Sequence, residues 1–400
     1  MSNTLLTPTA VVREAGRVLR SQLGFAMNVD RQYDNRFANS GAKIGTTLDV
    51  RLPNQYSIRT GKNMNVQDST DPYTTITVAD QAGVDLQFSS AELTLSIDEF
   101  SNRYLKPAMS TITSYIDQQG LALYKDIYNR VGTAGTTPNT ALVYLQAGGL
   151  MDNYLVPRDG QRTMCVNPDA QVATVNALSG VFNPATEISK QYRNGLMYND
   201  SLGFDFVTDQ NIPSLTTGTR TGTIVIDGTV ATEGSSTIHI DGFGGATQTV
   251  SAGETFTVAG VYAVNSQGVT LSSLQIFTVR ADVTAESSEA DLSVYPEMRT
   301  TGAYKTVSAF PQDGAAVTFY GAASTSYAQN LAFHKEAFAL VTADLEKPKG
   351  VDFCAREVMD NISIRIIRDY TIRTDDMPCR IDVLFGWKTL RRRLACRVSG

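Results

Sequence analysis

The spacing of hydrophobic positions changes several times along the chain, and each change predicts a different element. Thr7-Pro8 is typical of an N-cap followed by proline at the first helical position, and apolar residues from Val11 to Leu19 recur at helical spacing. A short amphipathic helix is therefore predicted here. Its other side carries Arg13, Arg17 and Arg20, which could meet acidic groups on a neighbouring chain or could face solvent.

From Gly45 onward the spacing has period two, as in strands with one buried face. Apolar residues alternate with polar ones from Leu48 to Leu52 and again from Ile76 to Phe88, so we expect the two arms of a long hairpin. A polar tip joins the arms, and such a two-stranded arm is marginally stable alone in water. A neighbouring subunit is its natural support, and a disordered surface loop is the alternative. The charged residues expected to contact another subunit are Asp49, Arg51, Arg59, Lys62 and Asp68.

A long helix is predicted after the hairpin. Ser96-x-x-Glu99 is a capping box, and a stripe of apolar and tyrosine side chains continues at helical spacing from Phe100 to about Arg130. Pro107 should kink or restart this helix, because proline removes a backbone hydrogen bond and clashes with the preceding turn. We expect the tyrosine-rich stripe to be a packing face.

Residues 135–213 mix short strands with helical spacing, which is typical of a compact α+β domain. The predicted strands are Ala141–Gln146, Thr163–Val166 and Gly203–Asp209, and the predicted helix is Asp169–Leu178.

Beyond Pro213 the composition changes sharply, with no lysine until Lys305. Short alternating strands are separated about every ten residues by glycine, serine and threonine, which predicts a small all-β sandwich or barrel. From Ser214 to Thr300 there are nine acidic residues against three arginines, so this segment has its own acidic surface and is predicted to be a domain inserted into another. The strand candidates are residues 223–226, 237–240, 255–264 and 274–281.

The C-terminal region returns to the earlier pattern and could close the sheet that the long helix crosses. Its strand candidates are residues 332–341, 362–370, 380–385 and 394–398. A basic run lies between the last two, and we interpret it as a solvated turn in preference to a nucleic-acid patch. This run consists of Lys388, Arg391, Arg392 and Arg393.

Composition and charge narrow the function. Charged residues make up 18% of the chain, against about a quarter in typical domains. The net charge of −6 argues against general affinity for nucleic acid, because phosphate binding needs a basic surface. No stretch approaches the roughly 20 apolar residues that cross a bilayer, and no secretory core follows the start, so we expect no membrane association.

The cysteines and histidines indicate no catalytic or metal chemistry. Cys165, Cys354, Cys379 and Cys396 are far apart in sequence, which predicts buried reduced thiols. His239 and His334 are the only histidines. We expect no catalytic, cofactor-binding or metal-binding residues, although a carboxylate pair assembled in space, as in glycosidases, would escape notice.

The order of these parts resembles the HK97-like capsid fold, in the branch of podovirus coat proteins that carry an inserted β-barrel. Several segments resemble that family in amino-acid sequence as well as in their order along the chain. They are Ser96–Pro107 (SIDEFSNRYLKP), Ala252–Asn265 (AGETFTVAGVYAVN), Gln275–Val279 (QIFTV), Phe333–Phe338 (FHKEAF) and Ser363–Tyr370 (SIRIIRDY).

The resemblance implies an α+β chain with peripheral and axial domains and an inserted all-β domain. Its parts would be an N-terminal arm over residues 1–40, an extended hairpin loop (the E-loop) over 41–93, and the spine helix of the peripheral domain over 94–134. The first part of the axial domain would cover 135–213, the inserted β-barrel-like domain 214–322, and the return through the axial domain and peripheral strands 323–400.

The resemblance also implies partners. The chain would assemble with itself as hexamers and pentamers into the icosahedral head shell enclosing the phage genome, first as a procapsid in the host cytoplasm. The N-terminal region lacks a highly charged helical segment, so we expect a separate scaffolding protein. A portal protein is another implied partner, and a decoration protein is a further candidate. Packaged double-stranded DNA would be contacted weakly and without specificity.

Two other classes of function remain open from sequence alone. An enzyme would need chemistry assembled from distant parts, since the glycine-rich run from Asp241 to Gly245 is flanked by strands where a phosphate loop needs a helix. A phage tail or fibre protein would suit the β-rich segment. The helical segments and the absence of an internal repeat argue against a fibre.

Overall fold

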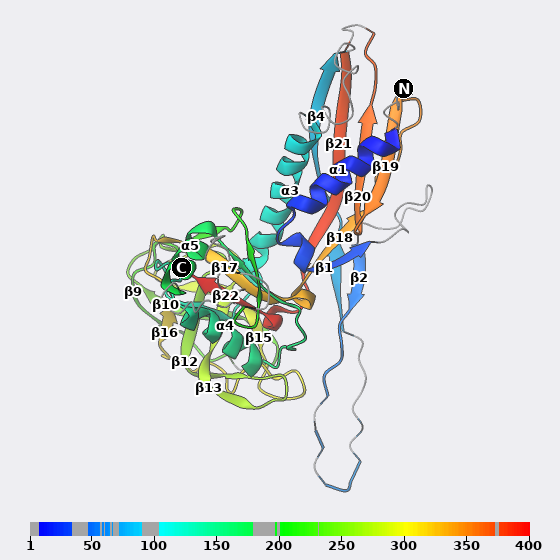
Figure 1. The fold of residues 1–400 in the computed structure, drawn as a ribbon. Coiled ribbons are helices and arrows are strands. Elements are labelled where there is room, and N and C mark those ends of the chain that lie inside the picture. The colour runs from blue at the N-terminus through cyan, green and yellow to red at the C-terminus, as the bar shows by residue number, and fades with distance from the viewer. Residues whose placement is uncertain are drawn as a thin grey trace. The chain divides into compact units, whose positions relative to one another are not determined.

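The computed structural model describes most of the chain (Figure 1). The described residues are all except 1–7, 34–46, 57, 60, 65, 67–71, 90–103, 179–196, 198–200, 231 and 373–375. The chain divides into two compact units. The first unit comprises Met1–Arg51, Tyr73–Gly120 and Phe338–Leu390, and the second comprises Leu52–Pro72, Leu121–Ala337 and Arg391–Gly400.

The first unit is built on a six-stranded sheet in which β1-β18-β21-β20-β19 are neighbours and β4 also pairs with β21. The β1–β18 pair is parallel, and the others are antiparallel. The strands are β1 (Asp30–Tyr33), β4 (Asp80–Ser89), β18 (Phe338–Ala343), β19 (Phe353–Met359), β20 (Ile362–Arg368) and β21 (Asp376–Thr389). A separate antiparallel pair is formed by β2 (Thr47–Arg51) and β3 (Tyr73–Thr77).

Two helices of the first unit pack through their apolar faces. The predicted N-terminal helix is confirmed as α1 (Pro8–Gln22), which buries Val12, Ala15, Val18 and Leu19. The second helix, α3 (Lys106–Leu121), buries Met109, Ile112 and Ile116. The buried Asp117 carboxylate accepts hydrogen bonds from the backbone N–H groups of Gly24 (2.8 Å) and Ala26 (2.9 Å). This carboxylate thereby ties α3 to the chain that follows α1.

Gly120 is fixed by close packing at the end of α3. A Cβ atom there would lie 2.7 Å from the Trp387 ring and 2.8 Å from the Phe25 ring, closer than side chains tolerate. The two rings lie beside each other with centroids 5.5 Å apart. Only glycine fits at this point.

The predicted hairpin is only partly correct. β2 and β3 pair in register from Thr47↔Thr77 to Arg51↔Tyr73, as expected for two arms. β4, however, pairs with β21 over its whole length, so the second half of the predicted arm belongs to the large sheet. The period-two pattern identifies which face of a strand is buried but does not identify its partner.

The long helix is also shorter than its sequence pattern. α3 begins at Lys106, directly after a π-helical turn at Tyr104 and Leu105, so the helix restarts beside Pro107 as predicted. The capping box at Ser96 lies outside the described residues. The α-helix ends at Leu121 and continues as a 3-10 turn, η5 (Ala122–Asp126). Ile127 is extended because the chain next enters β5 (Arg130–Gly132), which pairs with β22.

The second unit contains a sheet in the order β5-β22-β17-β6-β7, with β8 pairing β17. Its strands are β6 (Arg162–Val166), β7 (Asp205–Thr208), β8 (Ser214–Thr216), β17 (Ser326–His334) and β22 (Ala395–Ser399). The predicted strands around β6 and β7 are confirmed, as is the predicted helix, α5 (Pro168–Leu178).

The predicted strand Ala141–Gln146 is wrong, because these residues form the first turns of helix α4 (Ala141–Asn153). Tyr144, Ala147 and Met151 are buried at helical spacing, and this spacing extends beyond the six residues that suggested a strand. The Tyr144 hydroxyl lies 2.9 Å from that of Thr174 and so links α4 to α5.

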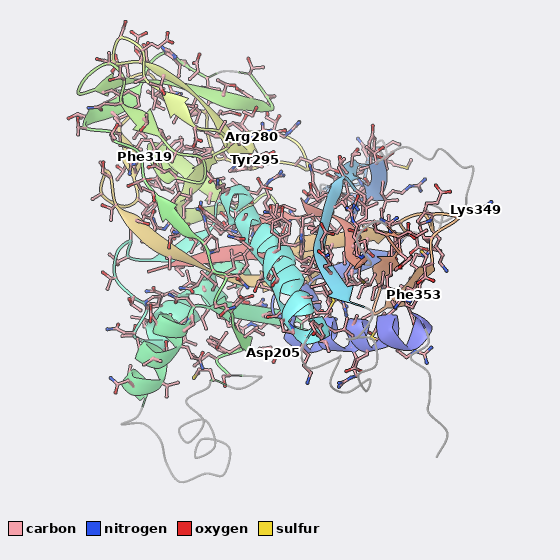
Figure 2. The ribbon with its side chains drawn as sticks, turned by 90° about the horizontal axis from the view of Figure 1, so that it is seen from above. Asp205, Arg280, Tyr295, Phe319, Lys349 and Phe353 are labelled. Carbon is pink, nitrogen blue, oxygen red and sulfur yellow. The ribbon has the colours of Figure 1, made fainter. Side chains whose placement is uncertain are left out.

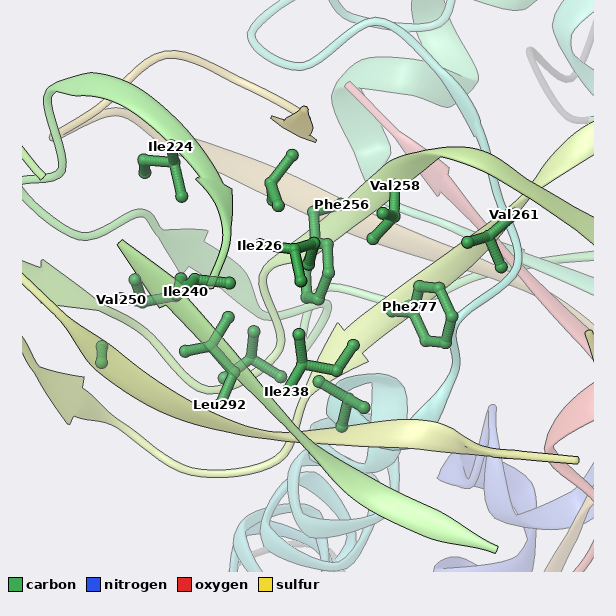
Figure 3. Packing of buried hydrophobic residues seen from close by; sticks show 14 of the residues in the cluster. Ile224, Ile226, Ile238, Ile240, Val250, Phe256, Val258, Val261, Phe277 and Leu292 are labelled. Carbon is green, nitrogen blue, oxygen red and sulfur yellow. The ribbon is translucent and has the colours of Figure 1, made fainter. Parts of the chain in front are cut away.

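The four predicted strands of the β-rich segment are confirmed as β9, β10, β12 and β13, and with β15 and β16 they form a sheet in the order β16-β12-β13-β15-β10-β9. Its strands are β9 (Gly222–Ile226), β10 (Ser235–Phe243), β12 (Thr255–Val264), β13 (Thr270–Val279), β15 (Ala290–Met298) and β16 (Val317–Phe319), and a small pair is formed by β11 (Thr249–Val250) and β14 (Val283–Thr284). The apolar positions of these strands share one core, in which the Phe256 and Phe277 rings stack at 5.6 Å (Figure 3). Each such side chain contributes about 1.5–3 kcal/mol on burial.

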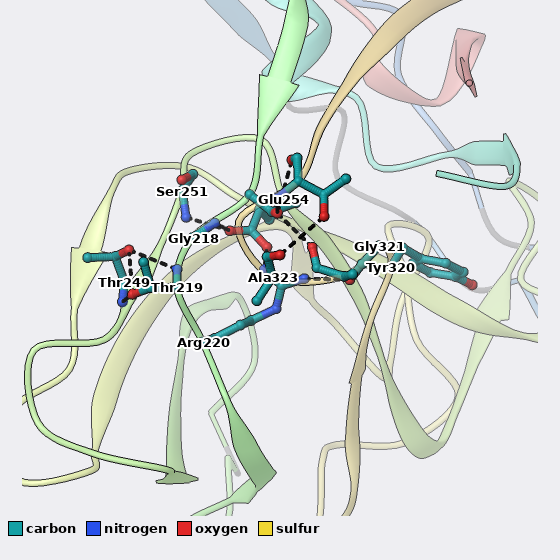
Figure 4. Close-up of polar contacts among 12 residues, drawn as sticks. Gly218, Thr219, Arg220, Thr249, Ser251, Glu254, Tyr320, Gly321 and Ala323 are labelled. Carbon is teal, nitrogen blue, oxygen red and sulfur yellow. Dashed lines mark hydrogen bonds and ion pairs between the residues drawn. The ribbon is translucent and has the colours of Figure 1, made fainter. Parts of the chain in front are cut away.

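A buried ion pair closes this β-rich segment where the chain enters and leaves it (Figure 4). The Arg220 guanidinium contacts the Glu254 carboxylate and donates to the Gly321 carbonyl at 2.9 Å. Glu254 also accepts from the backbone N–H groups of Gly218 (2.7 Å) and Ser251 (2.8 Å). Burial lowers the pKa of Arg220 and raises that of Glu254, so each charge depends on the other and on these hydrogen bonds.

The C-terminal strands are found close to their predicted positions. The single strand expected over 332–341 is divided into β17 and β18 by a 3-10 turn, η7 (Lys335–Ala337). β20, β21 and β22 correspond to the other three predictions.

The basic run was wrongly interpreted as a solvated turn. Lys388 lies within β21, and the following arginines are half-buried against protein groups. Arg391 donates to Glu336 at 2.7 Å, and the Arg392 guanidinium lies 3.6 Å from the centroid of the Tyr295 ring. Arg280 stacks on the same ring at 4.3 Å (Figure 2). Aromatic faces hold these cations by cation–π attraction, which a sequence pattern does not reveal.

The Arg220–Glu254 pair gives a stability prediction. We expect Glu254→Gln to lower the free energy of unfolding by about 3–5 kcal/mol, because it leaves a buried guanidinium without a countercharge. Urea unfolding measures this loss, with the exposed Glu297→Gln as the control, expected to cost under about 0.5 kcal/mol. A joint Arg220→Met, Glu254→Leu variant should recover part of the loss. A Glu254→Gln variant as stable as the control would show that the buried ion pair with Arg220 does not stabilise the fold.

Candidate assembly surfaces

The loop between β2 and β3, residues 52–72, exposes large apolar side chains. Its two ends are joined by a hydrogen bond from the Leu52 N–H to the Pro72 carbonyl, 2.7 Å long. Among its described residues, the large apolar side chains have exposed fractions from 63% to 89%. Large apolar side chains exposed on one loop are typical of a contact surface. They are Tyr56, Ile58, Met64 and Val66.

Arg59 orders the end of this loop. Its guanidinium donates to the Gly61 carbonyl and, at 2.6 Å, to the Asn63 carbonyl. Gly61 has a φ of +101°, a conformation that glycine adopts readily and that turns the chain back. The Arg59 charge therefore supports the turn that presents the neighbouring apolar side chains.

Gln55 anchors the base of the loop in a cavity of about 110 Å³. In the amide orientation that satisfies both ends of its side chain, the nitrogen donates to the Ala303 carbonyl at 3.0 Å and the oxygen accepts from both terminal nitrogens of Arg393 at 2.6 Å. Its backbone N–H also lies 3.5 Å from the Tyr304 hydroxyl. Burial lowers the pKa of Arg393, so the Gln55 oxygen is a valuable partner for this guanidinium.

Tyrosine rings surround this anchor. Tyr128 and Tyr154 also line the cavity and are almost fully buried, with ring centroids 6.3 Å apart. Burial raises the pKa of Tyr128 to about 12, so its hydroxyl stays neutral. The cavity lining contains two cations, Lys305 and Arg393, and no carboxylate. An amide oxygen fits such a site, and a carboxylate would fit it more strongly.

The charged hairpin residues that were expected to contact another subunit have different environments in the structure. Asp49 accepts a hydrogen bond from Thr75 across the β2–β3 pair, at 2.9 Å, so it serves the hairpin itself. Arg51 and Lys62 are exposed, and Asp68 lies outside the described residues. Arg59 is exposed and bonded within its own loop.

The arginines of α1 also have partners within the chain. Arg13 pairs with Glu357 of β19 at 3.0 Å, and Arg17 pairs with Glu14 at 2.8 Å. The Arg20 side chain lies outside the described residues. Both described pairs are largely exposed, so solvent screens them and they hold α1 only weakly.

Sequence reasoning missed the apolar side chains of the loop and the anchor. Ile58, Met64 and Val66 were passed over because each stands alone among polar residues and no periodicity marks it. The available signal was the presence of several large apolar residues in an otherwise polar loop. Nothing local in the sequence connects Gln55 with Arg393, which lies more than 300 positions later.

The histidines form charge clusters. The His239 ring nitrogens lie 2.8 Å from Asp291 and 3.3 Å from Asp227, and the hydrogen bond with Asp291 raises the pKa of His239. His334 lies 3.2 Å from Asp159. Across the part of the chain that the structure describes, no group of three or more His, Cys, Asp or Glu side chains could hold a metal ion. The cysteines in the same part are free, and all but the half-buried Cys354 are buried.

Comparison with known proteins gives the family of this chain. The family model described as P22 coat protein, gene protein 5, matches residues 3–396. The chain therefore belongs to the P22 coat protein family. It is a major capsid protein of a tailed bacteriophage and a component of the virion capsid that assembles with copies of itself into a shell.

Solved phage structures are similar at low identity. The Mycobacterium phage Che8 structure is 12% identical, covers 94% of this chain and 91% of its own, and has a TM-score of 0.46. The Cyanophage P-SCSP1u capsid is 9% identical with coverages of 93% and 86% and a TM-score of 0.44. The mature capsid of bacteriophage PhiM1 is 9% identical with coverages of 94% and 86% and a TM-score of 0.42. No curated protein matches.

None of the described helices is long and apolar enough to cross a membrane.

The anchor gives a prediction that does not depend on assembly. We expect Gln55→Ala to speed hydrogen exchange of the backbone amides of Leu52 and residues 54–56 at least about tenfold, because a hydrogen bond to a charged group contributes about 1.5–3 kcal/mol. Gln55→Glu should slow this exchange, since a carboxylate pairs with Arg393 more strongly. Lys62→Ala, in the same loop, is the control and should leave these amides unchanged. Equal exchange in all variants would show that Gln55 does not hold the loop.

Proposed function

We propose that this coat subunit builds an icosahedral shell by laying the loop of residues 52–72 over an adjacent subunit. The observation that carries the proposal is the exposure of Ile58 (89%), Met64 (82%) and Val66 (72%) on a loop whose base is anchored and whose turn is ordered. Leaving such side chains in water costs free energy that a neighbouring subunit would recover on contact. The contact is thus apolar, with Arg59 as its internal support.

The arrangement of the chain supports an HK97-like organisation with hexamers and pentamers. In this proposal the sheet of β1, β4 and β18–β21, crossed by α3, is the peripheral domain, and the β2–β3 pair with its loop is the E-loop. The sheet around β17 and β22, with α4 and α5, is the axial domain. Residues 214–322 are the inserted β-domain, and the clasp between Arg220, Glu254 and Gly321 supports entry and exit at one neck.

Assembly would proceed by many weak contacts. Each interface needs only a few kcal/mol, because a closed shell combines many of them, and strong pairwise binding would trap errors. We propose a procapsid assembled in the host cytoplasm with a separate scaffolding protein and a portal protein. A decoration protein is a further candidate partner, and the net charge of −6 favours only weak, non-specific contact with packaged DNA.

We also propose that the chain has no enzymatic role. The two histidines are engaged with carboxylates, and membership of a structural coat-protein family supports this. The tail or fibre alternative is not favoured by the family match.

The loop proposal predicts an assembly defect without a folding defect. We expect Ile58→Asp and Met64→Asp each to reduce shell yield at least roughly tenfold, because a charge in an apolar contact carries a desolvation cost of more than about 1.4 kcal/mol. Negative-stain microscopy and sedimentation measure the yield, and thermal melting of the monomer should be unchanged. Val269→Asp, at another exposed apolar position (55%), is the matched control. Normal shells from both loop variants would contradict the proposed contact between the 52–72 loop and an adjacent subunit.

A further inference from the structure

One face of helix α4 is exposed, uncharged and mostly apolar, and its one large polar side chain is Gln146. Leu142 and Leu145 are 61% and 50% exposed, and Gly149 is exposed on the same side of the helix, because positions i, i+3 and i+7 share one face. The opposite face, with Tyr144, Ala147 and Met151, is buried in the second unit. The exposed leucines therefore contribute nothing to that core.

Two adjacent glycines in α4 have different surroundings. A Cβ on Gly148 would meet the Phe204 ring at 3.5 Å, an ordinary packing distance within the chain. A Cβ on Gly149 would meet nothing within 4 Å. Glycine in an exposed helix interior is unfavourable relative to alanine, and nothing in the subunit requires it at position 149. A glycine there does allow another surface to approach the helix backbone closely.

The charge distribution indicates what that surface belongs to. Asp152 is the only charged residue of α4, and it is neutralised by Arg158 and, at 2.8 Å, by Arg162. Two copies of a chain with net charge −6 repel each other where like charges meet. An uncharged face avoids this repulsion, which suits a contact between identical subunits around a symmetry axis.

We propose that the Leu142–Leu145–Gly149 face of α4 is a subunit contact, packed in the shell against a second copy of this chain. The leucines supply apolar area, and Gly149 sets the distance of approach. This inference rests on the coat function but not on the 52–72 loop, so either contact can fail without the other.

The two glycines provide a matched test. Gly148→Ala and Gly149→Ala should each raise the monomer melting temperature by roughly 1–3 °C, since alanine reduces the entropy of the unfolded chain. Only Gly149→Ala should impair assembly, raising the protein concentration needed for shells by roughly tenfold or more through overpacking. Equal assembly of the two stabilised variants would overturn the proposal. The melting measurement separates this result from misfolding.

Crosslinking identifies the partner. A photoreactive amino acid at Leu142 should give coat–coat adducts in assembled shells and none in the monomer, while the same group at Ser110 on α3 reports background. Adducts of Leu142 with a scaffolding or decoration protein, or no adducts above background in shells, would exclude a second copy as the occupant of this face.

Discussion

The buried pairing of Arg220 with Glu254 is the constraint on which the second unit depends. An ion pair that burial penalises at both ends persists only where hydrogen bonds complete it, and here they come from Gly218, Ser251 and Gly321. Gly218 precedes the β-rich segment, Gly321 follows it, and Ser251 lies within it. The pair thus fixes the path of the chain into and out of roughly 100 residues, and the apolar core around Phe256 can form without strain on the sheet outside it.

The stability of the buried cores allows apolar side chains to remain exposed at the surface. Apolar side chains such as Ile58 and Leu142 stay in water because buried cores elsewhere supply the stability of the fold. Gln55 and Arg59 then restrict the loop, which reduces the entropy that a contact must overcome. A subunit arranged this way can bind weakly at several places without losing its own structure.

Local patterns in the sequence predicted where helices and strands form better than which strands or residues they pair with. α1 and the strands of the β-rich segment were found because their apolar spacing repeats over enough residues. β4 was assigned to the wrong neighbour, since period two reports burial and not pairing, and α4 was missed because six residues are too few to separate helix from strand. The Gln55–Arg393 anchor joins residues from opposite ends of the chain. No local rule connects such residues.

The surfaces differ in what they reveal about selection. An exposed apolar side chain such as Met64 lowers the solubility of the subunit. A glycine in a helix, such as Gly149, instead lowers the free energy of unfolding relative to alanine. With the proposed α4 contact, stability favours alanine and assembly favours glycine at position 149, and the chain carries glycine there. The same reasoning distinguishes Gly148, whose neighbour Phe204 leaves ordinary room for alanine, from Gly149, for which the subunit alone offers no explanation.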